Sequence, residues 1–204
     1  MILLTPGFGA SFKLYERFAM HFASHGFAVL GFDFVSGANP MDGQHDYKAR
    51  QVSYAIDYIL SDQSGFADNI DATGIGLAGH SMGGKVGLYA ASIDDRISAI
   101  VALDPVNVGG PPCFISPSNC RKYPVAPNPK RELVGTLNDV MAATLILRSA
   151  PDPLFNPEDE FNASWFFKGY DGNGLYAVPA PAVYVDMGET PHAFYIPLLS
   201  QPVS

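Results

Sequence analysis

The chain has 204 residues, of which 48% are hydrophobic and 16% charged, and its formal net charge is −8. This composition predicts a single globular domain spanning 1–204 with a sizeable core, and it argues against a disordered chain. Nothing in this acidic composition suggests a nucleic-acid or anionic-membrane partner, since both need a basic patch. No apolar run approaches the roughly 20 residues that would span a bilayer.

Apolar strand patterns alternate with amphipathic helix patterns along the chain. The N-terminal segment is interpreted as a core strand, because it is too short for a signal peptide and lacks the basic residues of one. No targeting segment is visible, so the compartment stays open. Strands are expected at 1–5, 27–32, 73–78, 97–103, 143–147 and 182–185. Helices are expected at 12–24, 47–60, from the end of the third strand to about 93, 158–167 and 194–199. This alternation predicts an α/β fold with a mostly parallel, doubly wound sheet and helices on both faces.

The segment from Gly79 to Gly83 reads Gly-His-Ser-Met-Gly, between a strand-like and a helix-like stretch. Gly-x-Ser-x-Gly in that context is typical of a nucleophile elbow, a sharp turn that exposes the serine hydroxyl. The two flanking glycines are expected because side chains would collide in so tight a turn. Ser81 is therefore the predicted nucleophile.

A serine hydroxyl needs a general base, and in α/β-hydrolases the catalytic residues follow the chain order Ser, Asp or Glu, His. One histidine, His192, lies beyond Ser81, just after the last predicted strand. A loop at that end of a parallel sheet can carry an imidazole over the site. His192 is therefore the predicted base.

Two carboxylates are candidates for the acid that orients this base. Asp104 ends the strand at 97–103 directly, which suits a buried and fixed carboxylate, whereas Asp152 follows the next strand between two prolines. We expect Asp104 to be the acid, with Asp152 as the alternative. The backbone N–H groups of Phe8, in the first Gly-rich turn, and of Met82, after the nucleophile, are the predicted oxyanion hole.

Four segments resemble the α/β-hydrolase superfamily and, within it, the chlorophyllase and cutinase-like polyester hydrolase group, which is dienelactone-hydrolase-like. They are Thr5–Gly9, Ala23–Val29, Ala55–Leu60 and Gly79–Gly84. The resemblance implies the α/β-hydrolase fold. That fold normally has further strands before the one that opens this chain, which implies a fragment or a minimal version lacking the N-terminal strands.

Features of the chain point to different subgroups of this family. Leu103–Val106 is similar to the segment that supplies the acid in chlorophyllases, and Asn162–Phe167 and the long loop at 105–140 also resemble them. Met82 stands where plant chlorophyllases usually have Arg and is similar to cutinases, which take their acid from the strand before Asp152.

The resemblance implies a serine carboxylic-ester hydrolase, chlorophyllase-like, that acts on a hydrophobic ester through a Ser-His-Asp triad and an acyl-enzyme. A cutinase or polyester hydrolase, a phospholipase or acetylhydrolase, and a non-catalytic scaffold that binds a ligand or partner are the alternatives. Aromatic residues near the predicted site loops favour an apolar substrate. The candidate substrate-binding residues are Phe12, Phe114, Trp165 and Phe194.

No cofactor is expected, because the first Gly-rich turn has neither the full dinucleotide pattern nor a P-loop lysine. No metal is expected either. The two cysteines, Cys113 and Cys120, lie in one Pro- and Ser-rich loop, and a local disulfide is the favoured interpretation, with two free thiols as the alternative. A zinc site is not expected, because two Cys without a nearby His do not supply four ligands.

Overall fold

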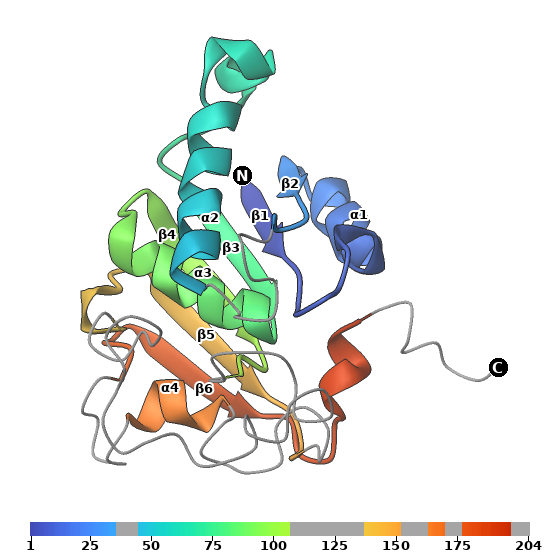
Figure 1. Cartoon of the computed structure of the whole chain (residues 1–204), viewed down its shortest axis with the longest axis vertical. Helices are drawn as coiled ribbons and strands as arrows, with labels where there is room; N and C mark the ends of the chain where they lie inside the picture. Colours follow the sequence, from blue (N-terminus) through green and yellow to red (C-terminus); the bar gives the residue numbers. More distant parts are fainter. Residues whose placement is uncertain (36–44, 107–136, 152–162, 170–176, 197–204) are drawn as a thin grey trace, which may run out of the picture.

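A computed structural model describes residues 1–35, 45–106, 137–151, 163–169 and 177–196. Within these ranges, six parallel strands form one sheet in the order β2-β1-β3-β4-β5-β6 (Figure 1). The strands are β1 (Ile2–Thr5), β2 (Val29–Gly31), β3 (Ile75–His80), β4 (Ile97–Leu103), β5 (Ala143–Arg148) and β6 (Ala182–Asp186). All six coincide with strands expected from the sequence, which confirms the parallel α/β architecture.

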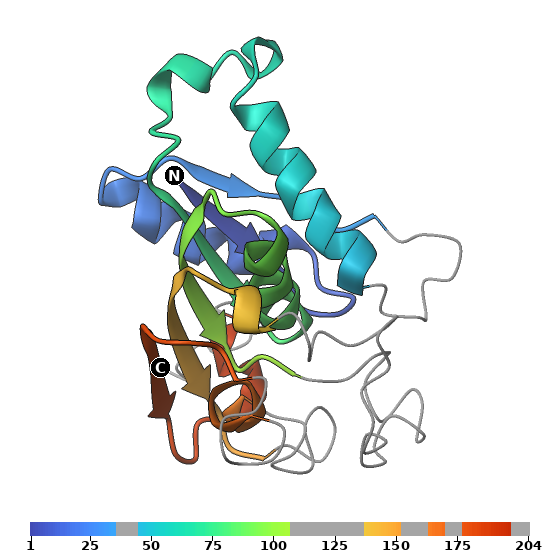
Figure 2. The same cartoon turned by 90° about the vertical axis from the view of Figure 1, so that its left-hand side faces the viewer.

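Helices cover both faces of this sheet. The α-helices are α1 (Glu16–Ser24), α2 (His45–Ile59), α3 (Met82–Ile93) and α4 (Ser164–Lys168). Short 3-10 helices are η1 (Phe12–Tyr15), η2 (Asp62–Ser64), η3 (Ala67–Asn69), η5 (Leu137–Asp139) and η7 (His192–Tyr195). Figure 2 shows α1 on one side of the strands and α2 with α3 on the other.

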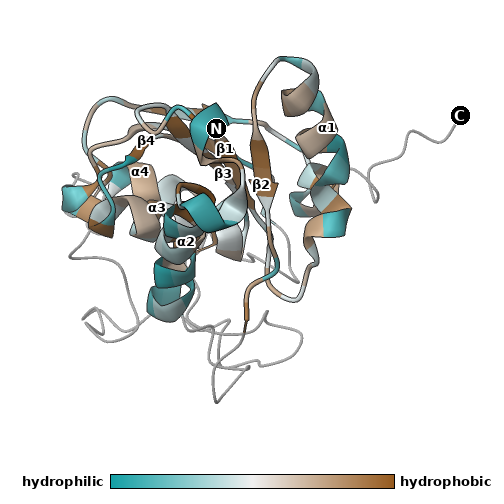
Figure 3. Ribbon diagram, turned by 90° about the horizontal axis from the view of Figure 1, so that it is seen from above, coloured by the Kyte–Doolittle hydropathy of each residue, from teal (hydrophilic) through white to brown (hydrophobic). Residues whose placement is uncertain are grey.

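The main core lies between the sheet and the pair α2 and α3. Leu77, Ile100 and Ile146 lie on neighbouring strands and are at most 2% exposed, and Val52 and Val86 from the two helices are fully buried against this cluster. In the hydropathy view of Figure 3, β4 in the middle of the sheet and β2 at its edge are both largely brown. Burial of this face is what holds the two helices on the sheet.

The opposite face is less completely covered than the sequence predicted. The apolar run of β4 suggested burial on both faces, but Ser98 and Ala99 are exposed. Likewise, the apolar stripe expected at 12–24 begins as the 3-10 helix η1, and no residue of α1 itself is fully buried. Asp33 accounts for the 3-10 turn at the start of the expected helix, because its carboxylate accepts hydrogen bonds from the Phe12 N–H at 2.5 Å and from the Ser11 hydroxyl at 3.1 Å.

The strand order creates the position of the site. From β1 the chain moves outward to β2 and then returns to the other side of β1 as β3, so the direction of winding reverses between β1 and β3. Ligands of open α/β sheets bind outside the carboxyl ends of the strands at such a switch point. The turn after β1 and Ser81 after β3 meet at this edge.

Candidate active site

Ser81 forms the turn between β3 and α3 with φ 55° and ψ −120°. A non-glycine residue with positive φ is strained and persists only where the surroundings hold it. Here the Ser81 N–H donates to the Leu103 carbonyl at 2.9 Å, and its own carbonyl accepts the Lys85 N–H at 3.2 Å. The turn is thus held between the end of β4 and the first turn of α3, in the geometry of a nucleophile elbow.

Gly79 and Gly83 are required by close packing, as the sequence predicted. A Cβ on Gly83 would lie 2.2 Å from the Thr5 carbonyl oxygen, and a Cβ on Gly79 would lie 2.4 Å from the Gly83 carbonyl oxygen. The Thr5 hydroxyl donates to that same Gly83 oxygen at 3.1 Å. The elbow is therefore pressed against the end of β1, which brings the serine beside the first Gly-rich turn.

Asp104 and His192, separated by 88 residues, are in direct contact. His192 Nδ1 lies 2.5 Å from Asp104 Oδ2, and the two side chains are 4% and 0% exposed. Ser149 also serves the carboxylate: its N–H donates to Oδ1 at 3.1 Å, and its hydroxyl donates to Oδ2. A buried carboxylate needs such donors, because an unpaired buried charge is costly. Asp104 itself has φ 44°, a second strained position at the same edge of the sheet.

Two further residues join this centre that the sequence did not single out. His80 precedes the serine, and its ring lies 4.6 Å from the His192 ring, between centroids. Burial, and then the neighbouring His192, hold the pKa of His80 well below its usual value, so His80 is neutral. The Tyr15 hydroxyl lies 2.7 Å from His80 Nδ1, and burial raises the pKa of Tyr15 to about 12. Tyr15 looked like one member of a helical stripe, and only the polar end of an otherwise apolar strand hinted at His80.

The two predicted oxyanion residues flank the serine from different elements. Met82 follows it as the first residue of α3 and is buried. Phe8 lies in the turn after β1, next to Gly7, where an added Cβ would be 3.4 Å from the Ser81 Cβ. The Gly-rich turn therefore lies against the predicted nucleophile.

The candidate substrate-binding rings lie on separate elements. The Phe12 ring packs on Gly31 of β2, where an added Cβ would lie 1.8 Å from it. Trp165 is 9% exposed and belongs to the hydrophobic core, whereas Phe194 in η7 is 50% exposed. Of these three rings, Phe194 is the most exposed, and it lies two residues after His192.

Several predictions fall outside the described residues: the alternative acid Asp152, the Cys113–Cys120 disulfide, the ring of Phe114 and most of the loop at 105–140. Among the residues that the structure describes, no group of three or more His, Cys, Asp or Glu side chains could hold a metal ion. Across those same ranges, no helix combines the length and hydrophobicity that crossing a membrane requires.

A cavity of about 80 Å³ lies between α1 and the sheet. Leu4, Phe18 and Phe22 contribute apolar walls, and Tyr15 and His80 line it as well. It lies on the face of the sheet that α1 covers, and Ser81 is not among its lining residues.

Two known ester hydrolases are similar to this chain in sequence. Cutinase est1 of Thermobifida alba is 36% identical over 105 residues, which are 51% of this chain and 34% of the cutinase. Bis(hydroxyethyl) terephthalate hydrolase of Streptomyces coelicolor is 27% identical over 211 residues, covering 94% of this chain and 66% of that enzyme. The chain thus spans about a third of the cutinase and less than two thirds of the terephthalate hydrolase.

The fold and the family follow from two further matches. The solved structure of the Pyrococcus furiosus esterase Pf2001 superimposes with a TM-score of 0.59 at 17% identity, covering 98% of this chain and 77% of the esterase, a likeness of fold alone. It confirms the predicted α/β-hydrolase fold. The family model described as "PETase: PET hydrolase-like" matches residues 1–111, more than half of the 204. The chain therefore belongs to the PET hydrolase-like family of cutinase-like α/β-hydrolases.

Proposed function

We propose that this protein is a carboxylic-ester hydrolase in which Ser81 is the nucleophile, His192 the general base and Asp104 the acid that orients it. The observation that carries the proposal is the buried 2.5 Å contact between His192 Nδ1 and Asp104 Oδ2 beside the strained elbow serine. A nucleophile, a base and a carboxylate converging from three strand ends are the requirements for activating a serine hydroxyl. Asp104 is favoured over Asp152 because it already accepts from the base.

The hydrogen bond to Asp104 determines which nitrogen of His192 can act as the base. A carboxylate oxygen only accepts, so Nδ1 carries the proton and Nε2 of the neutral ring carries the basic lone pair. Nε2 takes the Ser81 proton as the Ser81 oxygen bonds to the ester carbonyl carbon, and it then gives that proton to the departing alcohol. Water, deprotonated by the same nitrogen, next attacks the acyl-enzyme, and the proton returns to Ser81 as the acid leaves.

The negative charge of each tetrahedral intermediate lies on the former carbonyl oxygen. The N–H groups of Met82 and Phe8 are the proposed donors to this oxygen, one from the start of α3 and one from the turn after β1. Loss of a single donor of this kind typically lowers kcat by about 10²–10³-fold. The neutral state of His80 supports the mechanism, because a charged ring 4.6 Å from His192 would oppose the imidazolium that forms there.

The proposed substrate is an ester with an apolar or aromatic portion. Similarity to cutinases and to a bis(hydroxyethyl) terephthalate hydrolase favours polyester-type and terephthalate-type esters. The contact between Asp104 and His192 favours the chlorophyllase-like arrangement, in which the acid follows the earlier strand. Hydrolysis of bis(hydroxyethyl) terephthalate compared with that of a pigment ester, at equal enzyme concentration, separates these two substrate classes.

The test of the proposal is hydrolysis of p-nitrophenyl butyrate by the wild type and by Ser81→Ala. Removing the nucleophile is expected to lower kcat by at least about 10⁴-fold while the folded structure is retained. A fluorophosphonate probe is expected to label the wild type at Ser81 and not to label the variant. Wild-type rates in Ser81→Ala would refute the assignment, and an inactive, unlabelled wild type would favour a non-catalytic scaffold.

A further inference from the structure

A chain of three hydrogen bonds joins the turn after β1 to the loop that carries His192. The Gly7 N–H donates to the Tyr15 hydroxyl oxygen at 3.1 Å, and this oxygen lies 2.7 Å from His80 Nδ1. On the far side of the same ring, His80 Nε2 lies 3.1 Å from the His192 carbonyl oxygen. Tyr15, His80 and His192 are each at most 4% exposed. We call these contacts the Tyr15–His80 chain.

The direction of every bond in the Tyr15–His80 chain follows from its two ends. The His192 carbonyl only accepts, so His80 Nε2 must carry a proton. In a neutral imidazole the other nitrogen then has a lone pair, so Nδ1 accepts and the Tyr15 hydroxyl donates to it. That hydroxyl oxygen keeps a lone pair for the Gly7 N–H. Each donor therefore has one acceptor, and no member can be reversed without breaking a neighbouring bond.

Burial keeps both side chains in the protonation states that this order needs. It raises the pKa of Tyr15 to about 12, so the hydroxyl keeps its proton at working pH. Burial, and then the nearby His192, lower the pKa of His80 well below its usual value, so one ring nitrogen stays bare. The Tyr15–His80 chain is thus a fixed, uncharged set of hydrogen bonds rather than an ion pair.

The two ends of the Tyr15–His80 chain lie at the two loops of the site that must be aligned. Gly7 precedes Phe8, and an added Cβ on Gly7 would lie 3.3 Å from His80 Nδ1 and 3.4 Å from the Ser81 Cβ. The other end is the main chain of the residue whose imidazole contacts Asp104. Because the reacting groups tolerate misplacements of less than about 1 Å, a connection between these two loops affects catalysis directly.

We infer that Tyr15 and His80 are positioning residues, which hold the turn at Gly7 and the main chain of His192 at a fixed separation across Ser81. The inference rests on the proposed function, because it assigns these loops to the oxyanion hole and to the base. Neither side chain exchanges a proton with the substrate. Their loss is expected to lower the rate of the chemical step and to leave substrate binding nearly unchanged.

The kinetic test compares Tyr15→Phe with Tyr195→Phe. Both tyrosines are buried with ring centroids 5.9 Å from that of His80, but the Tyr195 hydroxyl has no hydrogen-bond partner among the described residues. With p-nitrophenyl butyrate, Tyr15→Phe is expected to lower kcat about 10- to 100-fold with KM within about twofold. Tyr195→Phe should stay within about twofold in both. Equal effects of the two variants, or a change in KM alone for Tyr15→Phe, would overturn the inference.

Two substitutions of His80 separate the two ends of the chain. Glutamine can extend an amide N–H to the position of Nε2 and keep the bond to His192, whereas asparagine reaches only the position of Nδ1. His80→Gln is therefore expected to keep a kcat about fivefold higher than His80→Asn, the worth of one hydrogen bond. An asparagine variant as active as the glutamine variant, or more so, would contradict a role for the His192 end.

A measurement without substrate keeps this inference distinguishable from the proposed function. The ¹⁵N chemical shifts of the His80 ring in the wild type are expected to report a bare Nδ1 and a protonated Nε2 between pH 6 and 9. The opposite tautomer would refute the Tyr15–His80 chain even in an active enzyme. An inactive wild type with the expected tautomer would instead refute the proposed function and leave the chain as a structural connection.

Discussion

Substitution of Asp104 by asparagine tests the candidate triad most directly. Among its described contacts, the carboxylate accepts from the Ser149 N–H, the Ser149 hydroxyl and His192 Nδ1. Asparagine has the same shape but one acceptor oxygen. If that oxygen keeps the Ser149 N–H, the amide NH₂ faces His192, and Nδ1 must then accept. The ring proton would shift to Nε2, which could no longer take the Ser81 proton.

The expected loss is about 10³- to 10⁴-fold in kcat, the range of a triad held in the wrong tautomer, or about 4–5.5 kcal/mol of transition-state stabilisation. The assay is hydrolysis of p-nitrophenyl butyrate under saturating conditions, with unfolding curves to establish that the variant is folded. Asp152→Asn is the matched control, since Asp152 is the other strand-end candidate. Collapse of activity in Asp152→Asn with a nearly unchanged Asp104→Asn would refute the reasoning and move the acid to the later strand.

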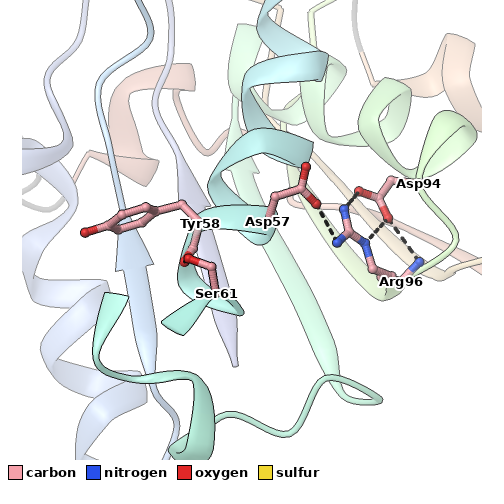
Figure 4. A network of polar contacts seen from close by, with 5 residues as sticks. All are labelled: Asp57, Tyr58, Ser61, Asp94 and Arg96. Atoms are coloured by element: carbon pink, nitrogen blue, oxygen red, sulfur yellow. Dashed lines mark hydrogen bonds and ion pairs between the residues drawn. The ribbon is translucent and has the colours of Figure 1, made fainter. Parts of the chain in front are cut away.

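Two predictions concern stability. Gly83→Ala is expected to lower the free energy of unfolding, measured in urea, by about 3 kcal/mol or more, since the added Cβ would lie 2.2 Å from the Thr5 carbonyl oxygen. A loss below about 1 kcal/mol would contradict the close packing of the elbow. Arg96 joins α2 to the turn before β4 by binding Asp57 and Asp94, each at 2.7 Å (Figure 4), and it holds the pKa of Asp94 below the usual value. Since the folded pKa of Asp94 is lowered, the stabilisation by Arg96 is present above the unfolded pKa near 4 and is lost as pH falls through the folded value. Asp94→Asn should therefore lower the free energy of unfolding by about 1 kcal/mol at pH 7 and by little at pH 2.5. An equal loss at both pH values would contradict this prediction.

The extent of β2 and the coverage of the sheet show where local sequence patterns stop being sufficient. The run at 27–32 has six strand-like residues, but only Val29–Gly31 pair with β1. The apolar run of β4 gave no sign that one of its faces would be partly exposed. Both properties depend on which element lies next to a strand in space. A local pattern records how apolar a segment is, and not what its neighbours cover.

The sequence alone predicted the succession of strands and helices along the chain, an elbow at Ser81 and His192 as the base, because turn chemistry and chain order can be read from short segments. It left Asp104 and Asp152 as alternatives, since both follow strands that end at the same edge. Only the tertiary structure brought Asp104 against His192 across 88 residues and joined Tyr15 to His80. Such contacts depend on strand register and side-chain direction, which form only when the whole sheet assembles.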